Sequence, residues 1–528
     1  MKTSFKAPKV LFGIIAALIL FVGSCEKMPF DGVKLLLDFN IIDTQIGVIV
    51  VDAKTGEAIT TGNLSVNITG PDKDRVMDIN GEETIKVANG IANLTLKSGT
   101  NPSAANPVSF TVVGKAQGYL SNSESVMIPE HGGYLVYLRL TSINDLPQGS
   151  SGIVDSSIKT SASGVTSGTV VIETPVISST GTMASLTIKE GTTILDANGN
   201  PLSGTINSTV VNFANQDDAA MQSFPGGFSM DAEMTGGETE NITMVTAGFI
   251  AITMVDEQGN VARNFDPPME VYMEIPAGTT DENDDPIGVG TVIPVWSYDE
   301  STGQWTQESF NAVVQGNTKN GDYFTAFEVA HLSWWNLDWF WNNCRFGATL
   351  TFNATSGACG ASSVWVEMRR TNGSYLSGRY MYLNSASHSF TLLNVPQNTA
   401  VDLIVRTAPN AEPLNSIFIP DLCSGNYTID FDLAGLTQPV TATFIGRCPD
   451  NPDIEIRPSA SGWYRKAAGG PWQIAYVWEG EITLCLEQNT PYIFGVVFDG
   501  QWYQYEFTST QSTYVFDLDL TEDICSSL

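Results

Sequence analysis

Residues able to perform chemistry are sparse in this sequence, and their spacing matches no common catalytic pattern. The three histidines, His131, His331 and His388, are isolated from one another. The zinc-protease helix H-E-x-x-H, the G-x-S-x-G elbow and a glycine-rich phosphate loop are all missing from the sequence. A glycosidase needs two carboxylates, so the 57 acidic residues leave that chemistry open. We predict a protein that is not an enzyme and has no cofactor and no metal.

The cysteines form the second set of reactive side chains, and six of the seven lie after residue 343. No Cys-x-x-Cys pair is present, so disulfides are a better interpretation than a metal site in an exported protein. Six cysteines permit fifteen pairings, and we favour pairs within each C-terminal domain. The candidates are Cys344, Cys359, Cys423, Cys448, Cys485 and Cys525.

Two acidic turns raise the question of a cation site. Residues 196–202 (DANGNPL) lack the longer loop and terminal glutamate of an EF-hand, so a hairpin turn is the better interpretation. The loop from Asp281 to Asp285 is more suggestive, because clustered carboxylates attract hard cations. We interpret it as an acidic solvated loop, and whether it binds a cation stays open.

The N-terminus has the layout of a bacterial secretory signal. Three lysines precede an apolar run over residues 10–22, which is too short for a typical membrane-spanning helix. The run ends in Val-Gly-Ser-Cys, which resembles a lipobox, in which small residues precede a cysteine that becomes lipidated. We predict a lipoprotein signal peptide over residues 1–24, lipid attachment at Cys25 and a tether over residues 25–40. An ordinary signal peptide with a cysteine nearby is the alternative.

Charge excludes two classes of partner. Without the three signal lysines, 22 basic residues face 57 acidic ones, a net charge of −35. Such a surface repels nucleic acids and anionic lipid head groups. No extended 3.6-residue apolar periodicity follows residue 25, and Gly, Thr, Ser and Asn are abundant. The fold class is therefore all-β, with tandem immunoglobulin-like or transthyretin-like β-sandwich domains.

The first sandwich is predicted over residues 41–144. It opens on a strand that runs into Asp-Ala-Lys-Thr-Gly and closes on YLVYLRL (residues 134–140). The opening resembles the carboxypeptidase-regulatory or transthyretin-like sandwich, although an unspecified immunoglobulin-like sandwich fits almost as well. Residues 145–168 are rich in Gly and Ser, which predicts a linker.

Residues 169–343 form a predicted Trp-rich β-domain. The sequence IPVWSYDESTGQW alternates into a turn and returns through a tryptophan, as a hairpin does. Together with PAGTT and HLSWWNLD, it resembles the extracellular β-domain shared by cartilage intermediate layer proteins and astroprincin-type proteins. The resemblance implies a fold and an extracellular location, and it transfers no catalytic residue. We expect Trp296, Trp305, Trp334 and Trp335 to lie in the core.

The C-terminal third contains an internal repeat. ATLTFNATSGAC matches VTATFIGRC, LLNVPQNTAVDLIV matches LCLEQNTPYIFGVV, and NYTIDFDL matches TYVFDLDL. The order and spacing of the three matches agree, which predicts two sandwiches of roughly 90 residues each. We place repeat A over residues 344–435 and repeat B over residues 436–528.

These features together suggest a non-catalytic, membrane-anchored envelope lipoprotein that acts as a structural, adhesion or binding module. We expect a rod of sandwiches that projects from the membrane. The domain string resembles chains from Bacteroidota-like envelopes, which implies the outer membrane and leaves its two faces open. The alternative is a glycan-binding surface lipoprotein that uses Trp463, Tyr464 and Trp472 in the loop-like SASGWYRKAAGGPW. This alternative requires Trp463 and Trp472 to be exposed.

Overall fold

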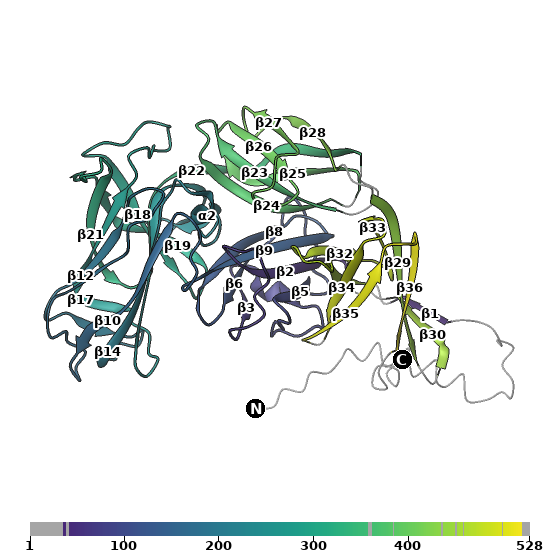
Figure 1. Cartoon of the computed structure of the whole chain (residues 1–528), viewed down its shortest axis with the longest axis horizontal. Helices are drawn as coiled ribbons and strands as arrows, with labels where there is room; N and C mark the ends of the chain where they lie inside the picture. The colour runs from purple at the N-terminus through teal and green to yellow at the C-terminus, as the bar shows by residue number, and fades with distance from the viewer. Residues whose placement is uncertain are drawn as a thin grey trace.

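The computed structural model consists of tandem β-sandwich domains, which confirms the predicted fold class (Figure 1). The described residues are 35–38, 42–356, 362–383, 385–433, 437–448, 451–457, 459–498 and 500–519. Apart from strands, this part of the chain contains a 3-10 turn (Lys73–Arg75) and the short helix α2 (Asp218–Met221). No helix within it is long and apolar enough to cross a membrane. The signal peptide and Cys25 lie outside the described residues, as does most of the tether.

The first domain packs two sheets face to face. One contains β4 (Val76–Asp78), β5 (Ile91–Leu96), β2 (Gln45–Asp52), β9 (Gly133–Ser142) and β7 (Tyr119–Leu120), in that order. The other contains β3 (Ser65–Thr69), β6 (Val108–Lys115) and β8 (Asn122–Ile128). Strand β2 lies antiparallel to β5 and parallel to β9. Its residues are buried on both faces, because Val48 and Val50 face the domain core whereas Ile49 and Val51 face another domain. A continuous apolar sequence is typical of a strand covered on both sides.

The predicted linker over residues 145–168 is wrong for its central part. Strand β10 (Ser150–Thr160) pairs with β14 (Gly204–Phe213) at the edge of a nine-stranded sheet. Ile158 from this strand is fully buried in the domain core. An edge strand with a bulge, here between Asp155 and Ile158, needs few apolar residues. The composition of β10 is therefore similar to that of a linker.

The Trp-rich domain also consists of two sheets. The nine-stranded sheet adds β15 (Ser229–Glu233), β16 (Thr239–Asp256), β18 (Val292–Asp299), β19 (Gln304–Val313) and β22 (Trp334–Ser356) to β10 and β14. The second sheet contains β11 (Val170–Glu173), β12 (Ala184–Ile188), β13 (Thr193–Leu195), β17 (Asn264–Ile275), β20 (Gly316–Asn317) and β21 (Tyr323–His331). Trp296, Trp305, Trp334 and Trp335 are at most 1% exposed, which confirms that they are core residues.

The motif WWNLDWFW at the start of β22 is buried because a core lies on each side of this strand. Trp335, Leu337 and Trp339 pack between the two sheets, whereas Trp334 packs into a second core on the opposite face. Successive side chains of a strand point to opposite faces, so aromatic residues at neighbouring positions of β22 serve both cores. Asp338 is fully buried, and this burial raises the pKa of its carboxyl well above the usual value.

Strand β22 crosses the predicted boundary between the Trp-rich domain and repeat A. Up to Asn342 it pairs with β16, and from Asn343 it pairs with β25 (Ser387–Pro396). The boundary predicted between residues 343 and 344 is therefore a change of pairing partner within one strand. In Figure 1, β22 runs from one domain into the next without a break.

Repeats A and B have the same strand plan, which confirms the internal repeat. In repeat A, β22 lies antiparallel to β25 and parallel to β28, and in repeat B, β29 lies antiparallel to β33 and parallel to β36. The second sheets have the orders β24-β23-β26-β27 and β32-β31-β34-β35. The strands of repeat A are β23 (Ser362–Arg370), β24 (Tyr375–Leu383), β25, β26 (Val401–Arg406), β27 (Asn415–Ile419) and β28 (Asn426–Asp432). Those of repeat B are β29 (Thr437–Cys448), β30 (Asn451–Arg457), β31 (Ala460–Lys466), β32 (Gln473–Val477), β33 (Glu481–Glu487), β34 (Pro491–Phe498), β35 (Gln501–Thr508) and β36 (Thr513–Asp519). Strand β1 (Leu35–Asp38), within the expected tether, lies parallel to β30.

The domains fold back on one another, so the expected rod is wrong. Figure 1 shows β32 and β34 of repeat B close to β2 and β5 of the first domain. Ile49, Val51 and Tyr137 of the first domain share a buried cluster with Trp463 and Tyr476 of repeat B. Large aromatic side chains remove much apolar area from water when they are buried, and this gain favours the folded-back arrangement.

Candidate functional site

The three aromatic residues predicted to bind glycan are buried, and this prediction is wrong. Trp463, Tyr464 and Trp472 are 0%, 4% and 8% exposed. The indole N–H of Trp463 donates to Oδ1 of Asn93 in the first domain at 3.3 Å. The glycine- and serine-rich sequence before it forms β31 rather than a loop. A Cβ atom at Gly462 would lie 2.2 Å from the ring of Phe494, so the small residue makes room for close packing.

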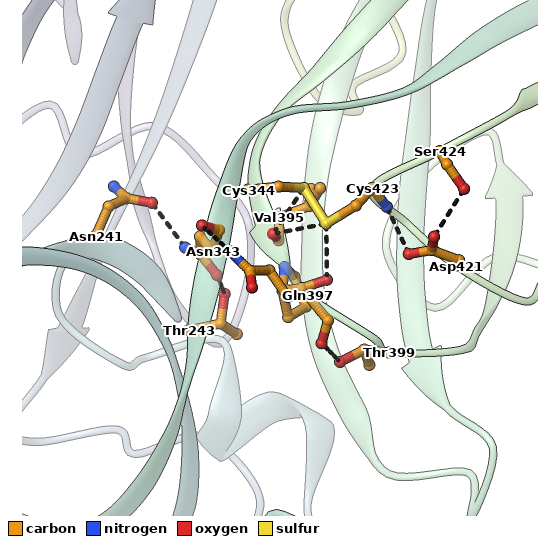
Figure 2. Close-up of a disulfide and its surroundings, with 11 residues drawn as sticks. Asn241, Thr243, Asn343, Cys344, Val395, Gln397, Thr399, Asp421, Cys423 and Ser424 are labelled. Atoms are coloured by element: carbon orange, nitrogen blue, oxygen red, sulfur yellow. Dashed lines mark hydrogen bonds between the residues drawn. A yellow bond between two sulfur atoms is a disulfide. The ribbon is translucent and has the colours of Figure 1, made fainter.

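The cysteines give one fully described disulfide, between Cys344 and Cys423. Both belong to repeat A, which confirms pairing within a domain for this bond. Figure 2 places it beside the junction with the Trp-rich domain, where Gln397 donates to the backbone oxygen of Asn343 at 2.9 Å. The Asn343 side chain in turn donates to Asn241 of the Trp-rich domain at 2.8 Å.

The other cysteine predictions have mixed outcomes. Cys448 is disulfide-bonded. Cys485 is a half-buried thiol on β33, so the disulfide predicted for this residue is wrong. Cys359 and Cys525 lie outside the described residues.

The acidic loop from Asp281 to Asp285 contacts repeat A, so it is not the freely solvated loop that we expected. Arg370 donates to the backbone oxygen of Asp281 at 2.8 Å and lies 2.5 Å from the Asp284 carboxylate. Asn372 also donates to Asp284, at 2.7 Å. The positive charge of Arg370 thus lies beside the carboxylates that we considered as cation ligands. The described residues contain no cluster of three metal-ligating side chains.

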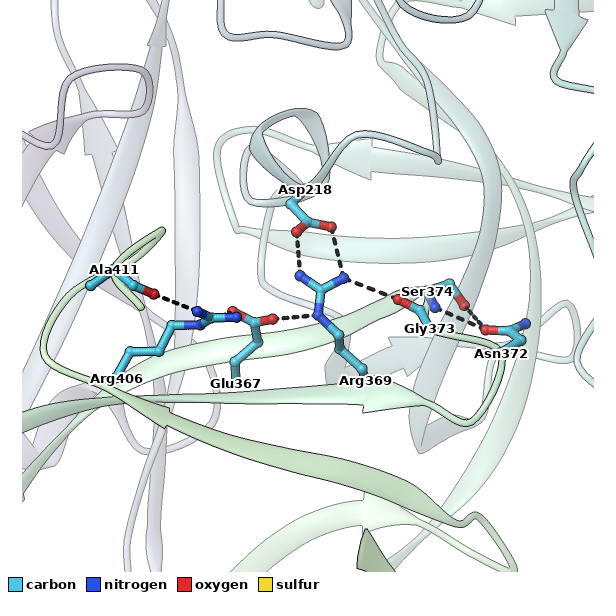
Figure 3. Close-up of polar contacts among 8 residues, drawn as sticks. All are labelled: Asp218, Glu367, Arg369, Asn372, Gly373, Ser374, Arg406 and Ala411. Atoms are coloured by element: carbon cyan, nitrogen blue, oxygen red, sulfur yellow. Dashed lines mark hydrogen bonds and ion pairs between the residues drawn. The ribbon is translucent and has the colours of Figure 1, made fainter. Parts of the chain in front are cut away.

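A second arginine joins the same two domains. Arg369 donates to both carboxylate oxygens of Asp218, the first residue of α2, and to Glu367 on its own strand (Figure 3). Glu367 also lies 3.3 Å from Nε of Arg406. Bidentate arginine–carboxylate pairs fix orientation as well as distance. These contacts hold repeat A in one orientation relative to the Trp-rich domain.

A large central cleft lies where the domains meet. Its volume is about 1360 Å³, and all four domains line it. Its walls come from β8 and β9 of the first domain, the chain leading into β15 of the Trp-rich domain, β24 of repeat A and the turn between β32 and β33 of repeat B. Concave sites between domains are where ligands commonly bind. The central cleft is therefore the candidate functional site of this structure.

Three charged side chains stand inside the central cleft. Glu124 on β8, Arg139 on β9 and Arg379 on β24 line it. Burial raises the pKa of Glu124 to about 7, although Arg139 and Arg379 act to lower it. Burial also lowers the pKa of Arg379. Arg379 lies deep between the domains. Its side chain is nevertheless exposed to solvent, because it faces the open cleft.

Tyrosine rings and unsatisfied polar groups surround these charges. Tyr137 and Tyr380 have ring centroids 4.9 Å apart, and the Arg139 guanidinium lies 4.8 Å from the Tyr137 centroid. Tyr382 meets Tyr476 edge to face at 4.7 Å. The Tyr380 hydroxyl and Nη2 of Arg139 are buried without a hydrogen-bond partner in the described part of the chain. Neither atom has accessible surface, so both groups stay unsatisfied at a cost to stability.

The sequence did not reveal this cleft, because its lining comes from four separate domains. One local signal was present. Arg139 interrupts YLVYLRL, a strand of otherwise apolar and aromatic residues. A charged residue in such a strand indicates a special environment.

Replacing Glu124 with glutamine is expected to flatten the pH dependence of stability. The Glu124 pKa is about 7 in the folded protein against 4.5 for the ordinary group, so the folded state binds more protons between these values. Stability therefore falls as pH rises from about 4.5 to about 7, by about 3 kcal/mol in all. The glutamine variant should unfold at a higher temperature than the parent at pH 8, as measured by calorimetry. Glu130→Gln, which removes an exposed carboxylate from the same cleft, is the control, and equal pH profiles for parent and Glu124→Gln would refute the assignment.

No known protein family matches the sequence, and no curated protein matches it. Among solved structures, a minor pilin of Streptococcus agalactiae is 8% identical over 33% of this chain and 94% of its own, with a TM-score of 0.13. A major pilin subunit of Bacillus cereus is 7% identical over 90% of this chain and 99% of its own, with a TM-score of 0.13. A pilus adhesin of Lactobacillus rhamnosus GG is 8% identical over 91% of this chain and 56% of its own, with a TM-score of 0.13. Similarity at this level identifies no family for the chain, and its fold class rests on its own strand pairing.

Proposed function

We propose that the chain is a non-catalytic, lipid-anchored protein of the cell envelope, in the outer membrane, that acts as a structural, adhesion or binding module. The signal sequence and Cys25 support the anchor. One structural observation supports the role as a structural, adhesion or binding module. The β-sandwich domains are joined into a single body with a fixed shape. A fixed shape suits a protein that presents surfaces to a partner.

Two joints of this body are of different kinds. The Trp-rich domain and repeat A share strand β22, so no flexible linker separates them. Arg369 and Arg370 add ion pairs to Asp218 and Asp284 across the same joint. Repeat B closes on the first domain through a buried aromatic cluster. Domains move independently where their interface is small and polar, and these interfaces oppose such motion.

Protease treatment of intact cells tests the location and the anchor together. We expect the parent protein to remain in the membrane fraction and to lose its exposed domains to the protease. The Cys25→Ala variant should leave the membrane fraction, because acyl chains contribute about 0.8 kcal/mol per buried methylene to membrane binding. A Cys25→Ala protein that stays in the membrane fraction contradicts the anchor. Complete protection of the parent protein in intact cells, with cleavage after lysis, contradicts a role at the cell surface.

A further inference from the structure

We infer that the central cleft binds an acidic saccharide, a polyhydroxylated ligand that carries a carboxylate. This inference goes beyond the proposed function, because it assigns a ligand class and a site. It does not use the three buried aromatic residues of repeat B. It also does not depend on the anchor or on the side of the membrane that the domains occupy.

The arginines supply the anion-binding part of the site. In the described chain, neither Arg379 nor Arg139 makes an ion pair, and the Arg379 side chain is exposed in the cleft. A carboxylate can accept two parallel hydrogen bonds from a guanidinium, so an arginine without an ion pair in a concave site suits an anionic ligand. Glu124 lies near enough to influence both arginines but forms no described ion pair with either. Two guanidinium groups thus share one carboxylate, which leaves one positive charge in excess.

Over the lining as a whole the charges balance, because Asp231 keeps its negative charge, so the positive excess is confined to the group formed by Glu124, Arg139 and Arg379. The Asp231 carboxylate accepts a hydrogen bond from Asn241 at 2.7 Å, and Glu481 pairs with Arg457 at 3.1 Å. Lys73 and Glu130 are exposed and opposite in sign. An anionic ligand therefore finds its complement at the arginines, although the whole chain has a net charge of −32.

The remaining lining matches a ligand that has many hydroxyl groups. Short polar side chains from three domains face the cleft, including Ser109, Thr111, Ser229, Gln304 and Thr391. The lining also contains tyrosine rings, among them Tyr134 and Tyr382, which supply apolar surface for the faces of sugar rings. Hydrogen-bonding groups beside flat rings suit a saccharide better than a purely apolar ligand.

The size of the cleft indicates an oligosaccharide rather than a single sugar. Pockets for small ligands typically measure about 300–1000 Å³. The central cleft, at about 1360 Å³, exceeds this range. Several sugar units can be accommodated, with one carboxylate placed against Arg139 and Arg379.

Calorimetric titration of the full mature chain tests the inference. The probes are a trisaccharide of galacturonic acid, the neutral trisaccharide of galactose and the peptide triglutamate. We expect the acidic trisaccharide to bind at least about tenfold more tightly than the neutral one, because a hydrogen bond to a charged group contributes roughly that factor. Arg379→Gln should weaken binding of the acidic trisaccharide by about tenfold or more. Arg345→Gln removes the same charge from an exposed site outside the cleft and should leave binding unchanged.

Several outcomes would overturn the inference. Equal affinity of the parent protein for the acidic and the neutral trisaccharide would show that the arginines do not bind the carboxylate. The same conclusion would follow if Arg379→Gln bound the acidic trisaccharide as tightly as the parent protein does. Tighter binding of triglutamate than of the acidic trisaccharide would assign the cleft to acidic peptides. Absence of binding to all three probes would reject the site, whereas the anchored, non-catalytic role tested by protease treatment would stand.

Discussion

Trp463→Ala is expected to lower the free energy of unfolding by about 3–5 kcal/mol, which is the usual cost of deleting a buried tryptophan. The side chain is fully buried between repeat B and the first domain. Its ring packs on Gly47, where an added Cβ atom would lie 2.8 Å from the indole. The substitution therefore removes packing at the joint and leaves Asn93 without its indole donor. Urea denaturation monitored by circular dichroism would measure the loss.

The same substitution should also open the molecule. Small-angle scattering should give a larger radius of gyration for Trp463→Ala, because repeat B is no longer held against the first domain. Tyr503→Ala is the matched control, since Tyr503 lies in the same domain and is 45% exposed. If the two variants have the same stability and the same radius, the aromatic cluster does not join these domains.

Removal of the Cys344–Cys423 disulfide is expected to destabilise repeat A by about 4 kcal/mol. The bond joins residues 79 positions apart, and a cross-link of this length strongly restricts the unfolded chain. The double variant Cys344→Ala/Cys423→Ala avoids leaving a thiol. Its melting temperature, measured by calorimetry, should be well below that of the parent.

Cys485→Ala controls for the loss of a cysteine side chain without the loss of a disulfide, because Cys485 is a thiol. It should melt close to the parent temperature. A double variant that melts with the parent would show that the cross-link contributes little, and that the adjacent contacts of Asn343 and Gln397 suffice.

Local sequence patterns predicted the domains well, because each pattern reflects forces within one sheet. Alternation and aromatic content placed Trp296 and Trp335 in the core, where they are fully buried. Matching segments identified repeats A and B, and they located the boundary at which β22 changes partners. The all-β class followed from the absence of helical periodicity. Each of these features depends on residues that lie close together in the chain.

The errors arose where one domain covers another. Trp463 and Trp472 lie in a polar, small-residue segment, and the sequence around them does not show that the first domain buries them. The edge strand β10 looked like a linker because one pairing partner and one buried face require few apolar residues. The loop from Asp281 to Asp285 is bound by Arg370, which lies about 90 residues further along the chain and in another domain. The central cleft depends on all four domains, so no single segment contains its pattern.

The folded-back arrangement has a consequence for the order of events during synthesis. The Gln45 side chain donates to the backbone oxygen of Val477, 432 residues later in the chain. Domains generally fold in the order in which they emerge from the ribosome, so the outer face of β2 exists long before its partner does. Ile49 and Val51 then present an apolar surface to water until repeat B has been made. A nascent or prematurely terminated chain thus has an apolar face available for a chaperone, and the completed chain hides it.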